Sequence, residues 1–598
     1  MTDASLSFEE RLRDHGPRLR RQLARLYGPD APASLWSRVE RMLREAARVR
    51  EPALRALDQA RIADPDWFVA PDMLGYSTYV DRYAGTVDGL AARVGHLERL
   101  GVRYLHLLAL LKARAGDSDG GFAIADYLAV EPRLGSMGDV ERLAARLREG
   151  RISLCVDLAL NHTADDHDWA SRAKAGDPHY RAFYHVLSAQ DAAAREHDLA
   201  QVFPSTAPGN FTDVPEMGGH VWTTFYPFQW DLNWANPEVM LAMIETMLAL
   251  ANRGFEAFRL DSTAFLWKQA GTNCRNLPEA HYIVRALRAA LDIAAPATLL
   301  KAEAIVPTAF VPPYFGADDG DGDGFEPECH LVYNNSLMVA GWVALAEGSA
   351  ALPRAIVAAS GGLPRGANWL TYARCHDDIG WGAVLGDLAG IDEAPIERLK
   401  AAARFTDGLA AGSWSRGEPF QSDGSVLHGS NGTMASLAGL EAAGDDAALR
   451  EAAFRRIALL NALAVASGGL ATTYMGDEAG LLNDHGYRDD PEHAHEGRWL
   501  HRPQMDWGAM AGDAATRISA DLARLRAARI ANGGAGAPAP LDTGHDAVLG
   551  IACGRDRVLL NFSGDAVALD ARGHDRLSDA AFGGTIAPWQ VAWLGDDA

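Results

Sequence analysis

The stretches GFEAFRLD (residues 254–261) and ATLLKAEA (residues 297–304) have the apolar character of two buried strands. The first closes on Asp261 and the second on Glu303. Successive side chains of a strand point to opposite faces, so Arg259 and Asp261 lie on the same face. Two strands joined by a helix predict a βαβ unit, with these charged residues at the carboxyl ends of parallel strands.

The same alternation extends in both directions along the chain. Helical stretches separate the runs, as at residues 237–253, where Asn236 is placed as N-cap and Gly254 follows the end. Eight βα units in series predict a (β/α)₈ barrel. An open sheet would also bury its strands, and the polar residues at strand ends favour the barrel. The six further runs are LGYSTYVDRYA (74–84), VRYLHLLAL (102–110), ISLCVDLAL (152–160), CHLVYN (329–334), ANWLTYARCH (367–376) and LATTYMGDE (470–478).

Three kinds of segment fall outside the alternation. The N-terminal region has helical spacing, two intervals after the third and seventh strands are too long for simple loops, and the last residues form short alternating strands. Both long intervals would lie on the carboxyl-terminal rim of the barrel, where active sites are built. We therefore predict a helical region (1–72), a barrel (73–158, 235–378 and 444–537), two rim insertions (159–234 and 379–443) and an antiparallel β domain (538–598).

Charge and composition narrow the class of protein. The formal net charge of −23 argues against nucleic-acid or anionic-membrane partners. Residues 457–475 suit a buried helix leading into a strand better than a membrane span, and the N-terminus shows no signal peptide. Five widely spaced cysteines indicate reduced thiols. We expect a soluble cytoplasmic protein, and the oligomeric state stays open between a monomer and a weak homodimer.

Polar residues close four of the predicted strands, in the order Asp157 to His162, Arg259 to Asp261, Glu303, and His376 to Asp378. Arg259 beside Asp261 helps to keep that carboxylate ionised, which a nucleophile needs. Two carboxyls about 5–5.5 Å apart are what a retaining glycosidase requires. The charge of Asp261 would raise the pKa of Glu303 and hold it protonated as an acid.

The remaining groups suit the positioning of a sugar. His162 and His376 can donate hydrogen bonds to hydroxyl groups, and Asp377 can accept them. Each motif alone also has a structural explanation, because a strand-end carboxylate often only caps a loop and a lone histidine is often part of the core. All four in order, each closing a strand, indicate a functional site.

These motifs carry a family resemblance. DLALNH, FRLD, AEA and CHDD resemble the four signature regions of glycoside hydrolase family 13, the α-amylase clan. The resemblance implies that Asp261 is the nucleophile, that Glu303 is the general acid/base and that Asp377 stabilises the transition state. It covers residues 73–598 in domain order.

Further stretches resemble the amylosucrase and sucrose hydrolase branch: SDGGFAIADY, VWTTFYPFQWDLNWANP, AFLWKQAGTNC, CHDDIGW, GDEAGLLND and GRWLHRP. The resemblance implies that Asp119 pairs with Arg498 and seals the floor of a glucose subsite. Phe122 stands where a glucose ring stacks, usually on a Tyr in amylosucrases. Asp378 and Gln421 match positions near the fructosyl side. Sucrose is the expected substrate, and residues 119, 122, 157, 162, 259, 376, 378, 421 and 498 are the expected binding set.

In this branch, the molecule that accepts the glucosyl unit from the enzyme determines which product forms. Polymer-making members carry an Arg where this chain has Ala200, and we align Leu399 with another, so water is the favoured acceptor. The prediction is a sucrose hydrolase. The alternatives are an amylosucrase-type glucosyltransferase, a sucrose isomerase and a non-catalytic sugar-binding or transporter-associated barrel. The last is expected to lack catalytic carboxylates and to carry a membrane anchor.

Two further segments carry patterns that suggest a calcium loop and a hinge. Residues 319–324, DGDGDG, imitate the start of a calcium loop, but position twelve is His330 instead of the required Glu. We predict an acidic rim loop there, and no metal or cofactor for the chemistry. Residues 428–432, HGSNG, are proposed as a hinge on the strength of their glycines.

Overall fold

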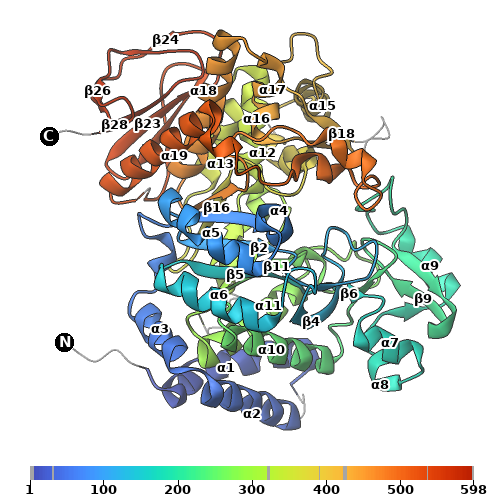
Figure 1. Cartoon of the computed structure of the whole chain (residues 1–598). Helices are drawn as coiled ribbons and strands as arrows, with labels where there is room; N and C mark the ends of the chain where they lie inside the picture. Colours follow the sequence, from blue (N-terminus) through green and yellow to red (C-terminus); the bar gives the residue numbers. More distant parts are fainter. Residues whose placement is uncertain are drawn as a thin grey trace.

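The computed structural model describes residues 6–29, 33–318, 324–389, 391–421, 427–534 and 536–595. Within them, parallel strands close into an eight-stranded barrel, as predicted (Figure 1). Their order around the barrel is their order along the chain, and the last strand pairs with the first. The barrel strands are β1 (Leu74–Tyr79), β2 (Tyr104–Leu108), β5 (Ser153–Ala159), β11 (Ala257–Asp261), β12 (Leu299–Ala302), β15 (Leu331–Tyr333), β16 (Asn368–Tyr372) and β20 (Leu470–Tyr474).

The sequence explains where these elements begin and end. Helix α10 (Pro237–Asn252) starts at Asn236, whose side chain accepts a hydrogen bond from the Glu238 amide, and Pro237 fills the first helical position. Strand β11 is buried along its length because helices cover the outside of the barrel. The other outer helices include α5 (Val87–Leu100), α6 (Met137–Glu149), α11 (Pro278–Ala294), α12 (Asn335–Glu347), α13 (Ala351–Ala359), α18 (Ala447–Ala466) and α19 (Asp513–Ala531).

The N-terminal region is helical, as expected, and packs against one side of the barrel (Figure 1). It comprises α1 (Phe8–Tyr27), α2 (Ala33–Val49) and α3 (Pro52–Ala63). Helix α1 begins with a capping box between Ser7 and Glu10 and packs along α11. Arg38 of α2 forms a bidentate ion pair with Glu238 at the start of α10, which ties this region to the barrel.

Two insertions follow barrel strands at their carboxyl ends, as predicted. The first follows β5 and contains β6 (His162–Ala164), α7 (Asp168–Lys174), α8 (Pro178–Arg181), β7 (Val186–Leu187), α9 (Ala189–Glu196), β8 (Phe211–Val214), β9 (Gly219–Trp222) and β10 (Gln229–Asp231). The second follows β16 and contains β17 (Ile379–Gly380), α14 (Leu385–Leu388), α15 (Pro395–Thr406), β18 (Glu418–Phe420), β19 (Gly429–Asn431), α16 (Met434–Leu437) and α17 (Leu440–Ala443). In Figure 1 the helices of the first insertion, in teal, stand out from the barrel.

The chain ends in the expected antiparallel β domain. Its six-stranded sheet has the order β21-β22-β23-β28-β25-β26 and lies at the opposite end of the molecule from α1 and α2 (Figure 1). Its strands are β21 (Ala539–Leu541), β22 (Val548–Cys553), β23 (Asp556–Asn561), β25 (His574–Asp575), β26 (Ala580–Ala581) and β28 (Val591–Gly595). The residue numbers that we assigned to the domain boundaries stay a prediction.

The structure also describes the cysteines, the apolar segment at residues 457–475 and part of the calcium-like motif. All five cysteines lie in the described part of the chain, and each is unpaired. Residues 457–475 form the end of α18 followed by β20, the buried helix and strand that we expected. In the described ranges, no helix combines the length and apolar character that a membrane span needs. Of the calcium-like motif at 319–324, residues 319–323 lie outside the described residues.

Candidate active site

The predicted catalytic carboxylates meet around one guanidinium group. Arg259 Nη1 donates to Asp261 Oδ1 at 2.8 Å, and Arg259 Nη2 donates to Glu303 Oε1 at 2.6 Å. Asp261 is the last residue of β11, and Glu303 directly follows the neighbouring strand β12. Because the two carboxylates bind the two terminal nitrogens of the same guanidinium, they lie close together, as paired carboxyl chemistry requires.

Ser262 bridges the same two carboxylates from the other side. Its amide donates to Glu303 Oε2 at 3.1 Å, and its hydroxyl donates to Asp261 Oδ2 at 2.9 Å. This contact requires Ser262 to have a φ of 52°, in the left-handed region that few non-glycine residues adopt. Backbone strain of this kind is characteristic of functional sites. Ser262 was not predicted, because a serine after a strand gives no distinctive signal.

The environment of Glu303 favours its protonated form. Burial raises its pKa to about 8 against the opposing charge of Arg259, and the negative charges of Asp261 and Asp377 add to the rise. A carboxyl group with this pKa is protonated at neutral pH and can act as an acid. This confirms the direction of the pKa shift that we expected for Glu303.

Asp157 lies behind Arg259, at the base of the site. Its Oδ1 accepts hydrogen bonds from Arg259 Nη1 at 3.1 Å and from His106 at 3.0 Å, and its Oδ2 accepts from the Ala109 amide at 3.0 Å. These partners hold the pKa of Asp157 well below its usual range despite its burial. Asp157 therefore holds Arg259 in place, and a direct contact between Asp157 and a substrate stays a prediction.

Asp377 lies between three cationic side chains. Its carboxylate is 3.3 Å from Arg498, 3.8 Å from Arg502 and 4.0 Å from Arg259. His376 Nε2 lies 3.4 Å from the same carboxylate. The Asp377 carboxylate can accept hydrogen bonds from sugar hydroxyls.

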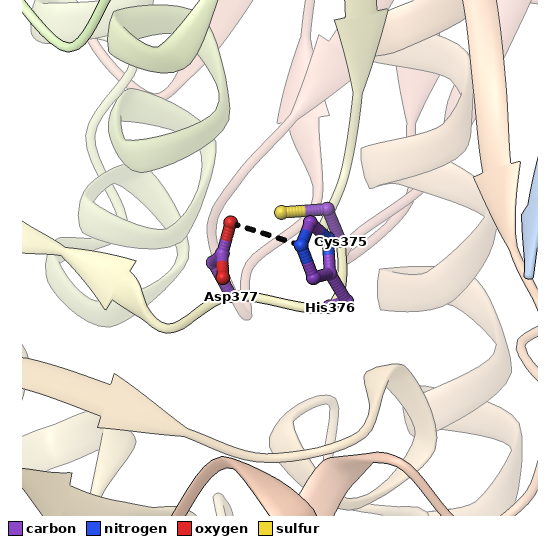
Figure 2. Close-up of side chains that lie close together, drawn as sticks. All are labelled: Cys375, His376 and Asp377. Atoms are coloured by element: carbon purple, nitrogen blue, oxygen red, sulfur yellow. Dashed lines mark ion pairs between the residues drawn. The ribbon is translucent and has the colours of Figure 1, made fainter. Parts of the chain in front are cut away.

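Cys375, His376 and Asp377 cluster closely enough to suggest a metal site (Figure 2). Burial raises the pKa of the Cys375 thiol to about 12. His376 stacks on Phe122, with ring centroids 5.3 Å apart. The absence of a metal from the chemistry stays a prediction.

Asp119 and Arg498, which we expected to pair, are in contact. Arg498 Nη2 donates to Asp119 Oδ1 at 2.7 Å, although 379 positions separate the two residues. A tight turn presents Asp119: its φ is 54°, and Gly120 and Gly121 also have positive φ. A Cβ atom on Gly120 would lie 2.8 Å from Arg502, so only glycine allows this turn to approach the arginines.

Glu496 holds Arg498 in place and was not foreseen. Its carboxylate accepts hydrogen bonds at 3.0 Å from Nε, Nη2 and the backbone amide of Arg498. It also accepts at 3.2 Å from the hydroxyl of Tyr226, which belongs to the first insertion. Arg498 therefore joins Asp119, Asp377 and Glu496 in one buried network.

Phe122 and His162 lie next to the network around Arg498. His162 Nε2 lies 3.3 Å from the Phe122 carbonyl oxygen and 3.0 Å from the Gln229 amide nitrogen. The guanidinium of Arg259 lies 5.3 Å from the centre of the Phe122 ring. Gln229 also donates to Asp119 at 3.2 Å. The predicted binding residues 119, 122, 162, 259, 376 and 498 are thus linked by direct contacts.

Asp378 lies against the second insertion. Burial raises its pKa to about 6. A Cβ atom added to Gly429 of strand β19 would fall 1.8 Å from Asp378 Oδ2. Gly429 therefore has a packing role that the sequence analysis did not recognise, because a glycine between polar residues resembles a turn.

Gln421 lies on the rim and connects the two insertions. Its amide nitrogen donates to Thr206 Oγ1 at 2.8 Å, and its amide oxygen accepts from the Ser205 amide at 3.2 Å. Its φ of 56° is again in the left-handed region. The described contacts bring Gln421 to the first insertion instead of to the carboxylates, and its role near a fructosyl unit stays a prediction.

Two arguments from the sequence are not supported by the structure. Leu399, which we aligned with an acceptor-side arginine, is completely buried within α15 and cannot contact an incoming sugar chain. Residues 429–431 of the proposed hinge form β19, the buried central strand of the sheet β17-β19-β18. Ala200, in contrast, is exposed, three residues before Phe203, whose ring lies 5.7 Å from the Arg498 guanidinium.

The fold and the site together define a (β/α)₈ barrel with an arginine-bridged carboxylate pair at the carboxyl ends of its strands. The alpha amylase catalytic domain profile matches residues 61–335. This part of the chain is therefore similar to the catalytic domain of the α-amylase family, glycoside hydrolase family 13.

Curated relatives agree with this assignment. Trehalose synthase/amylase TreS of Mycolicibacterium smegmatis is 32% identical over 343 residues, which cover 56% of this chain and 56% of that protein. Glucosylglycerate phosphorylase of Allomeiothermus silvanus is 33% identical over 297 residues, 49% of this chain and 48% of that protein. The chain spans about half the length of the curated relatives it matches.

Solved structures share the fold. Sucrose 6F-phosphate phosphorylase from Thermoanaerobacter thermosaccharolyticum aligns with a TM-score of 0.64 and 17% identity, over 82% of this chain and 93% of that one. Isomaltulose synthase from Klebsiella sp. LX3 aligns with a TM-score of 0.61 and 15% identity, over 88% and 98%. At these identities the likeness concerns the fold alone.

Proposed function

We propose that this chain is a retaining α-glucoside-active enzyme that hydrolyses sucrose to glucose and fructose through a covalent glucosyl-enzyme. The supporting observation is the arrangement around Arg259, which contacts Asp261 at 2.8 Å and Glu303 at 2.6 Å. Asp261 attacks the anomeric carbon, and Glu303 protonates the departing fructosyl oxygen. Glu303, then deprotonated, takes a proton from water, which attacks the intermediate and releases glucose.

Asp377 and the residues around Asp119 are assigned to the glucosyl unit. Asp377 accepts hydrogen bonds from ring hydroxyls, and these strengthen as the ring flattens toward an oxocarbenium-like state. The Asp119–Arg498 pair closes the end of the subsite, so that only a terminal glucosyl unit enters. The stacked rings of Phe122 and His376, 5.3 Å apart, offer an apolar face for the sugar C–H groups.

The choice of water as acceptor rests on Ala200. An alanine on the exposed rim donates no side-chain hydrogen bond to an incoming glucan, which leaves water favoured. The net charge of −23 does not oppose a neutral sugar. A transglucosylating enzyme is the second candidate, because trehalose synthase and glucosylglycerate phosphorylase are about one third identical over half of the chain.

Product analysis tests the proposal. The purified protein is incubated with sucrose alone, and separately with trehalose, and glucose, fructose, other disaccharides and glucans are quantified over time. Near-equal release of glucose and fructose from sucrose supports the hydrolase. Fructose in excess with glucan, or a new disaccharide, would establish the second candidate. No turnover of sucrose would overturn sucrose as the substrate.

The pKa of Glu303 sets the basic limit of activity. Its pKa is raised by burial to about 8, and the acid must be protonated, so kcat/KM is expected to fall as the pH rises through about 8. Because this pKa lies above the usual value of 4.5, the stabilising contribution of the protonated group is fully present below about pH 4.5 and is lost progressively as the pH rises to about 8. The pH dependence of kcat/KM between pH 5 and 10 measures this limb, and a basic limb near pH 6 would contradict the account.

Gly429 is expected to be essential for the position of Asp378. Gly429→Ala brings a methyl group to within 1.8 Å of the Asp378 carboxylate and displaces it, lowering kcat/KM by about 100-fold. Gly382→Ala is the control, because nothing lies within 4 Å of its added Cβ atom. Steady-state kinetics and thermal unfolding of both variants separate a local effect from misfolding. Equal activity of the two variants would exclude the role.

A further inference from the structure

Lys301 lies in the barrel interior below the carboxylates, two residues before Glu303 on β12. Its side chain is 1% exposed, and it forms no ion pair with a carboxylate among the described residues. The ammonium group lies 4.8 Å from the centre of the Tyr333 ring and 5.2 Å from that of Tyr104. Burying a cation without a directly contacting carboxylate is costly, so its presence calls for a function.

The polar partner of Lys301 is a histidine. Lys301 Nζ lies 3.3 Å from His106 Nδ1, and the other ring nitrogen, Nε2, lies 3.0 Å from Asp157 Oδ1. Burial lowers the pKa of His106 to about 4, so the ring is neutral and carries one proton. That proton sits either on Nδ1 or on Nε2, and the two tautomers place it on opposite sides of the ring.

We propose that Lys301 is a positioning residue that fixes the tautomer of His106 and thereby the orientation of Arg259 between the catalytic carboxylates. An ammonium group can only donate, so Nδ1 accepts and Nε2 carries the proton. Nε2–H then donates to Asp157. In the other tautomer, an N–H group would face the ammonium and a lone pair would face the carboxylate, and both contacts are repulsive.

A chain of hydrogen bonds links His106 to the catalytic carboxylates. Asp157 Oδ1 accepts from His106 and, at 3.1 Å, from Arg259 Nη1. Arg259 in turn contacts Asp261 at 2.8 Å and Glu303 at 2.6 Å. A wrong tautomer of His106 weakens the hold on Asp157 and leaves Arg259 free to shift, which changes the position of both carboxylates. Lys301 itself touches neither a substrate nor a reacting atom.

Burial lowers the pKa of Lys301 to about 8. The ammonium form therefore predominates below this pH, and the tautomer of His106 is held over the range in which Glu303 is also protonated. The groups that face Lys301 besides His106 are the Tyr104 and Tyr333 rings and the buried Cys155 thiol. The charges of Arg259, Asp157 and Glu303 also act on it.

The inference rests on the proposed function of the site, and a double-mutant cycle tests it. His106→Gln places an amide NH₂ near the position of Nε2, a donor to Asp157 that has no tautomer to lose. Lys301→Met is expected to lower kcat for sucrose about 10-fold or more in the wild-type background, the range of outer-shell effects. The same change is expected to alter kcat by less than about 2-fold in the His106→Gln background. Lys112→Met, on the exposed surface, is the control.

Equal losses in the two backgrounds would overturn the inference, because Lys301 would then act through packing alone. No loss from Lys301→Met in the wild type would overturn it as well. If Lys301→Met fails to fold, as judged by thermal unfolding, His106→Asn replaces it. The shorter amide cannot reach Asp157, so His106→Asn must be at least about 10-fold less active than His106→Gln.

A measurement without substrate distinguishes failure of this inference from failure of the proposed function. In ¹⁵N NMR spectra, with the His106 signals assigned by comparison with His106→Gln, wild-type His106 is expected to carry its proton on Nε2. Protonation on Nδ1 would overturn the inference whatever the substrate is. Nε2 protonation in a protein that does not cleave sucrose would overturn only the proposed substrate.

Discussion

Asp261→Asn is expected to lower kcat/KM for sucrose at least about 10⁴-fold, the scale that follows the loss of a catalytic nucleophile. An amide in place of the carboxylate cannot form the glucosyl ester, while its size preserves the packing around Arg259 and Ser262. The amide oxygen can still accept from Arg259 Nη1, at 2.8 Å in the wild type, while the amide NH₂ donates to Ser262 Oγ, which in the wild type donates to Asp261 at 2.9 Å. The variant should therefore fold normally and bind substrate.

Steady-state kinetics with the purified variant measure the loss, and thermal unfolding checks the fold. Asp88→Asn on the outer helix α5 is the control, because its side chain is 77% exposed and lies outside the site. A loss of less than about 10-fold in Asp261→Asn would assign the nucleophile to another residue.

Glu303→Gln is expected to separate the two chemical roles of this residue. Glutamine cannot protonate the fructosyl oxygen, so cleavage of sucrose should fall by about 10²–10⁴-fold. α-Glucosyl fluoride needs no protonation of its leaving group, so formation of the intermediate from that substrate should be largely retained. The basic limb near pH 8, which reports the raised pKa of Glu303, should disappear from this first step.

The activities of Glu303→Gln on sucrose and on α-glucosyl fluoride are measured and compared with those of the wild type. Glu397→Gln on α15, whose side chain is 75% exposed, serves as the matched control and should keep both activities. Equal losses of Glu303→Gln on sucrose and on the fluoride would show that Glu303 supports the site without acting as an acid.

The barrel was predictable because its signal is local. Each strand is a short apolar run, and helix α10 carries its N-cap and first-turn proline in the sequence itself. The same holds for Asp261 and Glu303, since a charged residue at the end of a buried strand is conspicuous. The alternation of side chains places Arg259 and Asp261 on one face, and the 2.8 Å contact between them agrees.

The rest of the site depends on contacts between distant segments. Asp119 and Arg498 lie 379 positions apart, and only the family resemblance suggested that they meet. Gly429 acts through the space that its missing side chain leaves for Asp378, and Ser262 acts through its backbone conformation. Residue type alone reveals neither. The burial of Leu399 was not foreseen, because an alignment through an insertion does not distinguish a buried helix face from an exposed one. Lys301 was not predicted, although it is a charge inside an apolar strand, because its partner His106 belongs to another strand.

Trapping the glucosyl-enzyme tests the central claim most directly. Glu303→Gln is incubated with α-glucosyl fluoride, digested with protease and analysed by mass spectrometry. Because the variant lacks the base for the second step, the intermediate should accumulate, with one glucosyl unit on the peptide that contains Asp261 and none when Asp261→Asn is added. A glucosyl unit on another residue, or release of inverted β-glucose without any adduct, would contradict the double-displacement mechanism at Asp261.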